Sequence, residues 1–370
     1  MVILESTELN QLLEGLTSRG YLLIGPTVRS GAIVYDEIHS AEDLPRGVGD
    51  DQLPARYSLR HRGDAMFFGY GVGPVSWKKY LYPPRLTMFR ATRAGKGFTI
   101  APGETEPRPR AAFIGVRPCE LNGIFIQDKV FTGGPYVDGA YKKARDNAFI
   151  VAVNCTESGA NCFCASMGTG PGATKGFDVS LTEVLQGERH YFTAEAGSPR
   201  GEEVLGALSA RDATEQEEKA GLDAVARAGS SQVKRMDVCD LPQLLSDNFE
   251  NARWDDVAKR CLACTNCTMV CPTCFCSTVE DATDLTGVHA ERSRRWDSCF
   301  TMDFTKVAGG NIRPSTRARY RQWLTHKLSN WMGQFGTLGC VGCGRCITWC
   351  PSGIDLTAEV DAIRGNGVHA

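Results

Sequence analysis

Two runs of cysteines with one shared spacing are the residues of this chain best suited to chemistry. The first run is Cys261, Cys264, Cys267 and Cys271, and the second is Cys340, Cys343, Cys346 and Cys350. Each follows the pattern C-x2-C-x2-C-x3-C-P, which is typical of loops that bind [4Fe–4S] clusters. The proline after the last cysteine turns the backbone away from the loop. The sequence therefore predicts two such clusters.

The fourth cysteine of each run is expected to bind the cluster of the other run, as in proteins that carry two such runs. This rule predicts one cluster on Cys261, Cys264, Cys267 and Cys350, and a second on Cys340, Cys343, Cys346 and Cys271. Zinc sites and disulfides are the alternatives, but zinc sites usually combine two separate pairs of cysteines. Clusters of this kind carry single electrons, so we expect electron transfer and predict no catalytic residue.

Four further cysteines follow two apolar segments, 111–116 and 148–153, that are typical of strands buried on both faces. These cysteines are Cys119, Cys155, Cys162 and Cys164. Sites in open α/β sheets form beyond the carboxyl ends of the strands, so the four thiols are expected to converge. They are the ligands of a possible third [4Fe–4S] cluster. The alternative is a set of buried packing thiols, because free cysteine is among the most buried residue types.

Other groups near the runs allow two interpretations each. Cys274, Cys276 and Cys299 are either a further metal site or packing thiols that donate weakly to cluster sulfur. Lys259 and Arg260 directly precede the first run and either tune its cluster or simply end a solvated helix. Cys239 stands alone and is most simply a structural thiol.

The composition is that of a globular cytoplasmic protein. The 370 residues are 42% hydrophobic and 23% charged, with a net charge of −2, which argues against nucleic-acid binding. The first residues lack the pattern of a signal peptide. No segment reaches the ~18 apolar residues of a spanning helix, so we expect no direct membrane insertion. The sixteen cysteines are then expected to be reduced and available as metal ligands.

The expected fold class is α+β/α. An N-terminal mixed α/β domain is predicted at 1–240 and a mainly helical, ferredoxin-like dicluster domain at 241–370. Strands are predicted at 21–26, 31–35, 64–74, 111–116 and 148–153, a loop at 41–64, and helices at 6–20, 121–129, 212–227, 241–260 and 315–332. Trp254 and Val257 should face inward. The glycines at 69–73 do not match the dinucleotide-binding fingerprint.

The helix predicted at 315–332 has an apolar and a basic face. The basic residues are Arg317, Arg319, Arg321, His326 and Lys327. This face either docks an acidic partner or is only solvated, as most charged faces are.

The chain resembles the iron–sulfur beta subunit of cytoplasmic NAD(P)-linked nickel–iron hydrogenases of the sulfhydrogenase type. It is also similar to the A subunit of anaerobic sulfite reductase. The resemblance spans roughly residues 110–352. Beyond the two runs, its motifs are GVRPCE at 115–120, NCT at 154–156, CFC at 162–164, CPTCFC at 271–276 and WDSC at 296–299.

The resemblance implies a relay role. In such complexes a flavin subunit takes a hydride from NAD(P)H, and the beta-type subunit passes single electrons to the hydrogenase small and large subunits, or to a sirohaem subunit. The chain shows neither the separated Cys-x2-Cys pairs of a nickel–iron site nor a P-loop. A different hypothesis is an oxidoreductase active by itself, with a cluster or a flavin near the glycine-rich segment 168–172.

Overall fold

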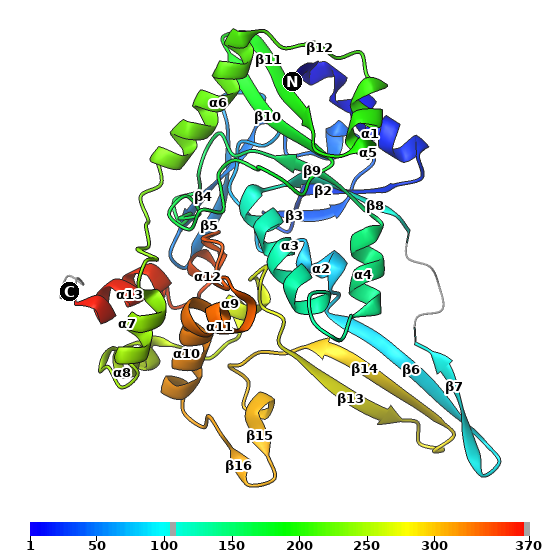
Figure 1. The fold of residues 1–370 in the computed structure, drawn as a ribbon, viewed down its shortest axis with the longest axis vertical. Helices are drawn as coiled ribbons and strands as arrows, with labels where there is room; N and C mark the ends of the chain where they lie inside the picture. Colours follow the sequence, from blue (N-terminus) through cyan, green and yellow to red (C-terminus); the bar gives the residue numbers. More distant parts are fainter. Residues whose placement is uncertain (104–108, 366–370) are drawn as a thin grey trace.

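A mixed eight-stranded sheet lies at the centre of the larger part of the molecule (Figure 1). The computed structural model describes residues 1–103 and 109–365. The strand order of the sheet is β12-β1-β11-β10-β9-β8-β2-β3. In chain order the strands are β1 (Val2–Glu5), β2 (Leu22–Arg29), β3 (Ala32–Glu37), β8 (Ala111–Val116), β9 (Ala148–Val153), β10 (Val179–Gln186), β11 (Arg189–Ala196) and β12 (Arg211–Asp212). The four central strands run parallel, and antiparallel strands flank them on both sides.

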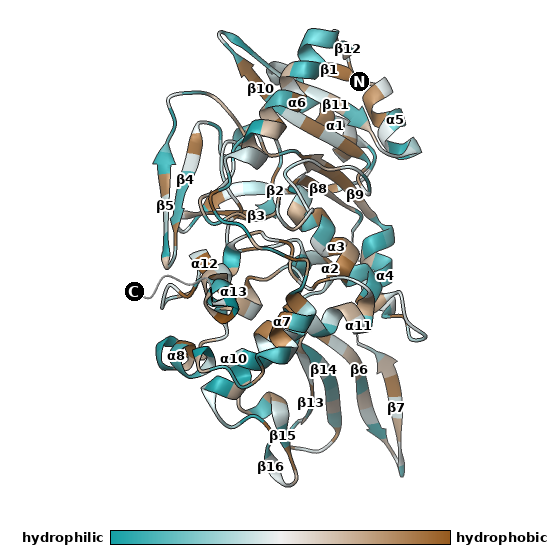
Figure 2. Ribbon diagram, turned by 60° about the vertical axis from the view of Figure 1, so that its left-hand side comes forward, coloured by the Kyte–Doolittle hydropathy of each residue, from teal (hydrophilic) through white to brown (hydrophobic). Residues whose placement is uncertain are grey.

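Helices cover both faces of this sheet, which explains why β8 and β9 are continuously apolar. Along β9, Phe149, Val151 and Val153 pack with α1 (Leu9–Ser18) and α5 (Pro199–Gly206). The alternate residues pack on the other face. That face carries α2 (Lys78–Leu81), α3 (Pro118–Phe131) and α4 (Gly139–Asp146), while α6 (Glu215–Ser230) lies along β10 and β11. Figure 2 shows the apolar colouring of this interior.

A second, four-stranded antiparallel sheet extends away from this body (Figure 1). Its order is β13-β14-β6-β7, with β6 at Arg85–Ala94, β7 at Gly97–Pro102, β13 at Ser277–Thr283 and β14 at His289–Trp296. Two strands come from each half of the chain. The expectation of a mixed α/β fold is therefore confirmed, but the C-terminal part contributes strands as well as helices. The division at residue 240 stays a prediction.

Six C-terminal helices pack around a second apolar core. They are α7 (Leu241–Asp247), α8 (Arg253–Arg260), α9 (Asn266–Met269), α10 (Thr316–Thr325), α12 (Arg345–Thr348) and α13 (Leu356–Arg364). Trp254 and Val257 of α8 are fully buried in this core, as predicted. Helix α11 (Trp331–Phe335) packs instead in a smaller cluster with Cys119 and Val341. A π-helical turn, His326–Asn330, joins α10 to α11. Within the described residues, no helix is long and apolar enough to cross a membrane.

Two local predictions are wrong. Residues 41–64, expected as loop, contain the hairpin of β4 (Val48–Leu53) and β5 (Arg56–His61). Residues 64–74, expected as a strand, form no strand. Side chains bind the backbone there instead: the Glu183 carboxylate accepts from the amides of Phe67 and Phe68 at 2.7 and 2.8 Å.

Smaller elements complete the described chain. Short 3-10 helices occur at Ser6–Glu8, Ala41–Asp43 and Asp303–Thr305, and strands β15 (Lys306–Val307) and β16 (Gly310–Asn311) form a two-stranded pair.

Candidate iron–sulfur centre

The two cysteine runs share one backbone conformation. In both runs, the backbone has the left-handed conformation (positive φ) at two positions: two residues after the first cysteine and one residue after the second. These are Ala263 (φ 52°) and Thr265 (φ 71°) in the first run, and Gly342 (φ 63°) and Gly344 (φ 75°) in the second. A short helix then begins in each, α9 and α12, and the two helices contact each other. The sequence repeat is therefore a structural repeat.

The first run holds this shape although it lacks glycine at the two left-handed positions. Left-handed backbone costs a residue with a Cβ roughly 1–2 kcal/mol, and such strain persists only where the surroundings impose it. In both runs the same amide donates to the sulfur of the first cysteine: Ala263 N to Cys261 Sγ at 3.4 Å, and Gly342 N to Cys340 Sγ at 3.5 Å. The conformation thus aims backbone donors at thiols, as ligands of an anionic cluster require.

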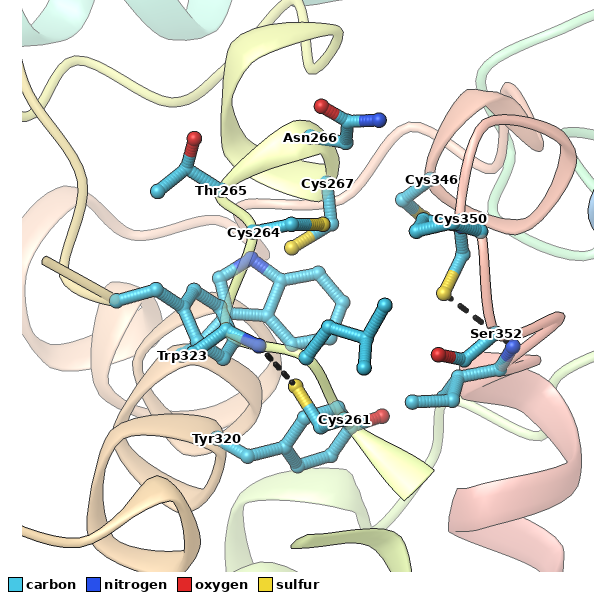
Figure 3. A pocket seen from close by; sticks show the side chains of 15 residues that line it. Cys261, Cys264, Thr265, Asn266, Cys267, Tyr320, Trp323, Cys346, Cys350 and Ser352 are labelled. Carbon is cyan, nitrogen blue, oxygen red and sulfur yellow. Dashed lines mark hydrogen bonds between the residues drawn. The ribbon is translucent and has the colours of Figure 1, made fainter. Parts of the chain in front are cut away.

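A pocket with about 420 Å³ of empty space, part of it open to solvent, lies at the first run (Figure 3). The cysteines that line it are Cys261, Cys264, Cys267, Cys346 and Cys350. Cys350 therefore comes from the second run into the cavity of the first. Phe300, Tyr320 and Trp323 complete an aromatic wall. A set of thiol donors beside an aromatic wall fits a [4Fe–4S] cluster.

The fourth cysteine of the first run lies among thiols of the second. Burial raises the pKa of Cys346 well above its usual value, and the neighbouring thiols of Cys340, Cys343 and Cys271 raise it further. Cys271 itself is 9% exposed. The crossed arrangement stays a prediction, and the placement of Cys271 and Cys350 supports it.

All sixteen cysteines are free thiols. Among the described residues, no three His, Cys, Asp or Glu side chains are placed to hold one metal ion together.

The structure brings the third group of cysteines together beside the second run. Burial, followed by the thiols of Cys164, Cys155 and Cys343, raises the pKa of Cys162. Cys119 lies in the first turn of α3, directly beyond β8, and Cys155 follows β9. This is the convergence that the ends of two parallel strands predict.

Polar side chains reach two of these thiols. Arg117 Nη1 lies 3.8 Å from Cys155 Sγ, and Gln232 Nε2 donates to Cys164 Sγ at 3.1 Å. The backbone amide of Phe163 donates to Gly342 O at 2.8 Å, which joins this group to the second run. A Cβ added at Gly170 would meet Cys164 Sγ at 3.0 Å, so the glycine-rich segment packs closely against this group.

A buried ion pair also links the second run to the third group. Arg345 lies between two cysteines of the run, and its Nη2 donates to Glu120 Oε1 at 2.5 Å, beside Cys119. Both side chains are 0% exposed. Arg345 also donates to Gly73 O at 2.7 Å, and Glu120 accepts from the hydroxyl of Tyr35.

Lys327 is the site residue that sequence reasoning misplaced. It was expected on a basic face, in contact with a partner or with solvent, but it is 5% exposed and its Nζ lies 3.2 Å from Cys271 Sγ. Burial alone would lower the pKa of Lys327, yet the thiols of Cys271, Cys274 and Cys340 raise it well above its usual value. A signal was available: Lys327 lies three residues after Leu324, on the apolar side of the helix.

The remaining basic residues have internal partners. Arg319 is also buried and donates to Phe300 O at 3.0 Å, and Arg317 and Arg321 pair with Glu250 at 2.8 Å. His326 lies 3.1 Å from Gln334 Oε1. Before the first run, Arg260 binds Glu359 at 2.7 Å and Asp256 at 2.9 Å rather than a thiol.

Cys274 and Cys276 lie near Lys327, beside the second site, while Cys299 is hydrogen-bonded to Cys276 and is also close enough to Cys267 of the first run for that thiol to raise its pKa. Cys274 Sγ is 3.6 Å from Lys327 Nζ. A hydrogen bond from Cys299 lowers the pKa of Cys276 to about 7, and the nearby ammonium groups of Lys327 and Lys78 contribute to this shift. Cys239 is exposed.

Comparison with known proteins matches this region to a family. Residues 260–354 match the 4Fe-4S dicluster domain family, which indicates two [4Fe–4S] clusters. The chain is 33% identical over 345 residues to the sulfhydrogenase 2 subunit beta of Pyrococcus furiosus, across 89% of this chain and 98% of that protein. No solved structure matches.

Proposed function

This chain belongs to the family of sulfhydrogenase beta subunits, and from that premise we propose that it relays electrons between an NAD(P)H-oxidising flavin subunit and a nickel–iron hydrogenase module in the cytoplasm. The chain is an iron–sulfur electron-transfer protein. The observation that carries the relay is the cavity lined by three cysteines of the first run together with Cys346 and Cys350 of the second. It supports two crossed clusters held close enough to exchange electrons.

The chain's own residues position the clusters and exclude water. A bound [4Fe–4S] cluster supplies one-electron transfer, and its potential depends on charge, hydrogen bonds to sulfur and exposure. Phe300, Tyr320 and Trp323 cover the first site, while the second site is closed by buried groups. Cys264 is exposed, so the first site is the one nearer the surface.

We propose a third [4Fe–4S] cluster on Cys119, Cys155, Cys162 and Cys164. Burial, followed by other thiols of the group, raises the pKa values of Cys119, Cys162 and Cys164, and Arg117 offers a buried guanidinium beside Cys155. The hydrogen bond between Phe163 and Gly342 would hold this cluster next to the second one.

The anaerobic sulfite reductase setting remains the second candidate for the partner. The similarity to a sulfhydrogenase subunit favours hydrogenase small and large subunits. Affinity purification of the tagged chain from its own cells decides between them: a nickel–iron large subunit supports our proposal, and a sirohaem protein in its place would contradict it.

The central experiment is an iron and sulfide count on the anaerobically purified chain, with EPR of the reduced protein. Two clusters give about eight irons and three give about twelve. Cys350→Ser should lower the count by about four, and Cys162→Ser should do the same if the third cluster is present. Cys239→Ser is the matched control and should change nothing. An iron-free wild-type chain would overturn the proposal.

A further inference from the structure

One buried lysine side chain donates a hydrogen bond directly to a predicted cluster ligand. Lys327 lies in the π-helical turn His326–Asn330. Such turns are rare and occur frequently at functional sites. The turn directs the ammonium away from solvent, and only 5% of Lys327 is exposed.

The ammonium group has a partner for each of its three protons. Its Nζ lies 3.2 Å from Cys271 Sγ, 3.0 Å from Thr273 Oγ1 and 3.0 Å from Gly339 O. Thr273 in turn donates to Gly339 O at 2.6 Å. Gly339 directly precedes Cys340, so Lys327 joins the last cysteine of one run to the first cysteine of the other.

A second buried lysine lies close by but contacts no sulfur. Lys78 Nζ donates to the carbonyl oxygens of Thr268, Met269 and Cys274 at 3.2 to 3.4 Å. It also lies 3.9 Å from the ring centroid of Trp296. Two buried cations therefore surround the loop that follows Cys271.

The first site has a different environment. Backbone amides donate to two of its thiols: Ala263 N to Cys261 Sγ, and Ile354 N to Cys350 Sγ, both at 3.4 Å. The buried Arg319 acts on Cys261 through space, but its guanidinium donates to Phe300 O and not to a sulfur. Within residues 1–103 and 109–365, no lysine or arginine side chain donates to Cys261, Cys264, Cys267 or Cys350. The two sites thus have equivalent backbones, but in the described chain only the second has a lysine ammonium hydrogen-bonded to a ligand sulfur.

We propose that Lys327 makes the two clusters unequal by raising the reduction potential of the one that Cys271 ligates. Adding an electron makes a cluster more negative, and a fixed positive charge in a dry interior stabilises that state more than the oxidised one. Solvent exposure at Cys264 also favours the more negative reduced state of the first cluster, and the buried charge of Lys327 outweighs this effect in our proposal. Electrons then settle on the buried cluster of Cys271, Cys340, Cys343 and Cys346. This inference rests on the proposed function, because it requires both clusters to be present.

The test is an EPR-monitored redox titration of the anaerobic full-length chain and its Lys327→Gln variant. Glutamine keeps a hydrogen-bond donor and removes the charge. The expected result is that one midpoint potential falls by at least the equivalent of a tenfold change in the reduced-to-oxidised ratio, about 59 mV for one electron. The other potentials should not move.

Two further variants isolate the charge. Lys327→Arg keeps it and should leave the potentials near those of the wild type. Lys96→Met removes an exposed lysine in the turn between β6 and β7 and is the matched control. Iron counts accompany every titration.

Unchanged potentials in a fully loaded Lys327→Gln protein would overturn the inference. Loss of iron from both Lys327 variants would also overturn it, since Lys327 would then serve cluster retention rather than potential. An iron-free wild type would instead refute the proposed function, so the two failures are distinguishable.

Discussion

Replacing Glu120 by glutamine should strongly destabilise the protein. Glutamine has nearly the same shape, but it removes the negative charge that faces Arg345 at 2.5 Å. Both side chains are fully buried, so water cannot screen the guanidinium that remains. Its other partners are the carbonyl oxygens of Gly73 and Val75 at 2.7 and 3.3 Å, which carry no full charge, and the sulfur of Cys343, which compensates the guanidinium only in part because its charge is shared with the cluster.

Removing one partner of a buried ion pair costs about 3–5 kcal/mol. At about 1.4 kcal/mol for each factor of ten, this corresponds to a roughly 140- to 3,700-fold shift in the unfolding equilibrium. A domain is commonly stable by only about 5–15 kcal/mol, so the loss is a large share of the total.

The assay is an anaerobic urea titration of the iron-loaded protein, followed by far-UV circular dichroism and by visible absorbance. Glu250→Gln is the control, because Glu250 pairs with Arg317 at the surface and exposed pairs contribute little. Combining Glu120→Leu with Arg345→Met should recover part of the loss, because the uncompensated buried charge is gone. A Glu120→Gln midpoint no lower than that of Glu250→Gln would refute the reasoning.

Two further variants test the loop backbone and the acid stability. Gly342→Ala should lower the iron count and destabilise the protein by more than the ~1–2 kcal/mol that a left-handed alanine costs, because its Cβ would lie 2.7 Å from the backbone of Cys164. Gly287→Ala is the control, since Gly287 has a similar φ and open space around it. Equal losses of stability in the two variants would contradict the close contact at Gly342. Hydrogen bonds from Arg211, and then from Thr214 and Arg189, hold the pKa of Glu217 well below its usual value. Its contribution is therefore present above about pH 4.3 and is lost as the pH falls below that. Glu217→Gln should accordingly have a lower urea midpoint than the wild type at neutral pH, and the difference should shrink in acid; a difference that grows in acid would count against this assignment.

The parts of the site that were predicted from sequence have strong local signals. The spacing of the cysteines fixes which thiols share a loop, and the apolar segments before Cys119 and Cys155 mark strands buried on both faces. The position of these thiols then follows from the geometry of a parallel sheet.

The parts that were missed depend on contacts between distant residues. Lys327 has the residue type of a solvated face, and only the arrival of Cys271 and Gly339 makes its burial favourable. The hairpin of β13 and β14 lacks apolar alternation because much of it is exposed. A cross-strand ion pair, Asp281 with Arg292 at 2.6 Å, takes the place of apolar contacts there.

The four-stranded sheet has a consequence for biosynthesis. Arg90 of β6 pairs with Glu291 of β14, 201 residues later in the chain. At about 5–20 residues per second, the ribosome needs roughly 10–40 s to make that distance. During this time the nascent β6–β7 hairpin has an unpaired edge, which is the kind of surface on which chains aggregate. A chaperone that shields this edge during translation would therefore raise the yield of intact protein.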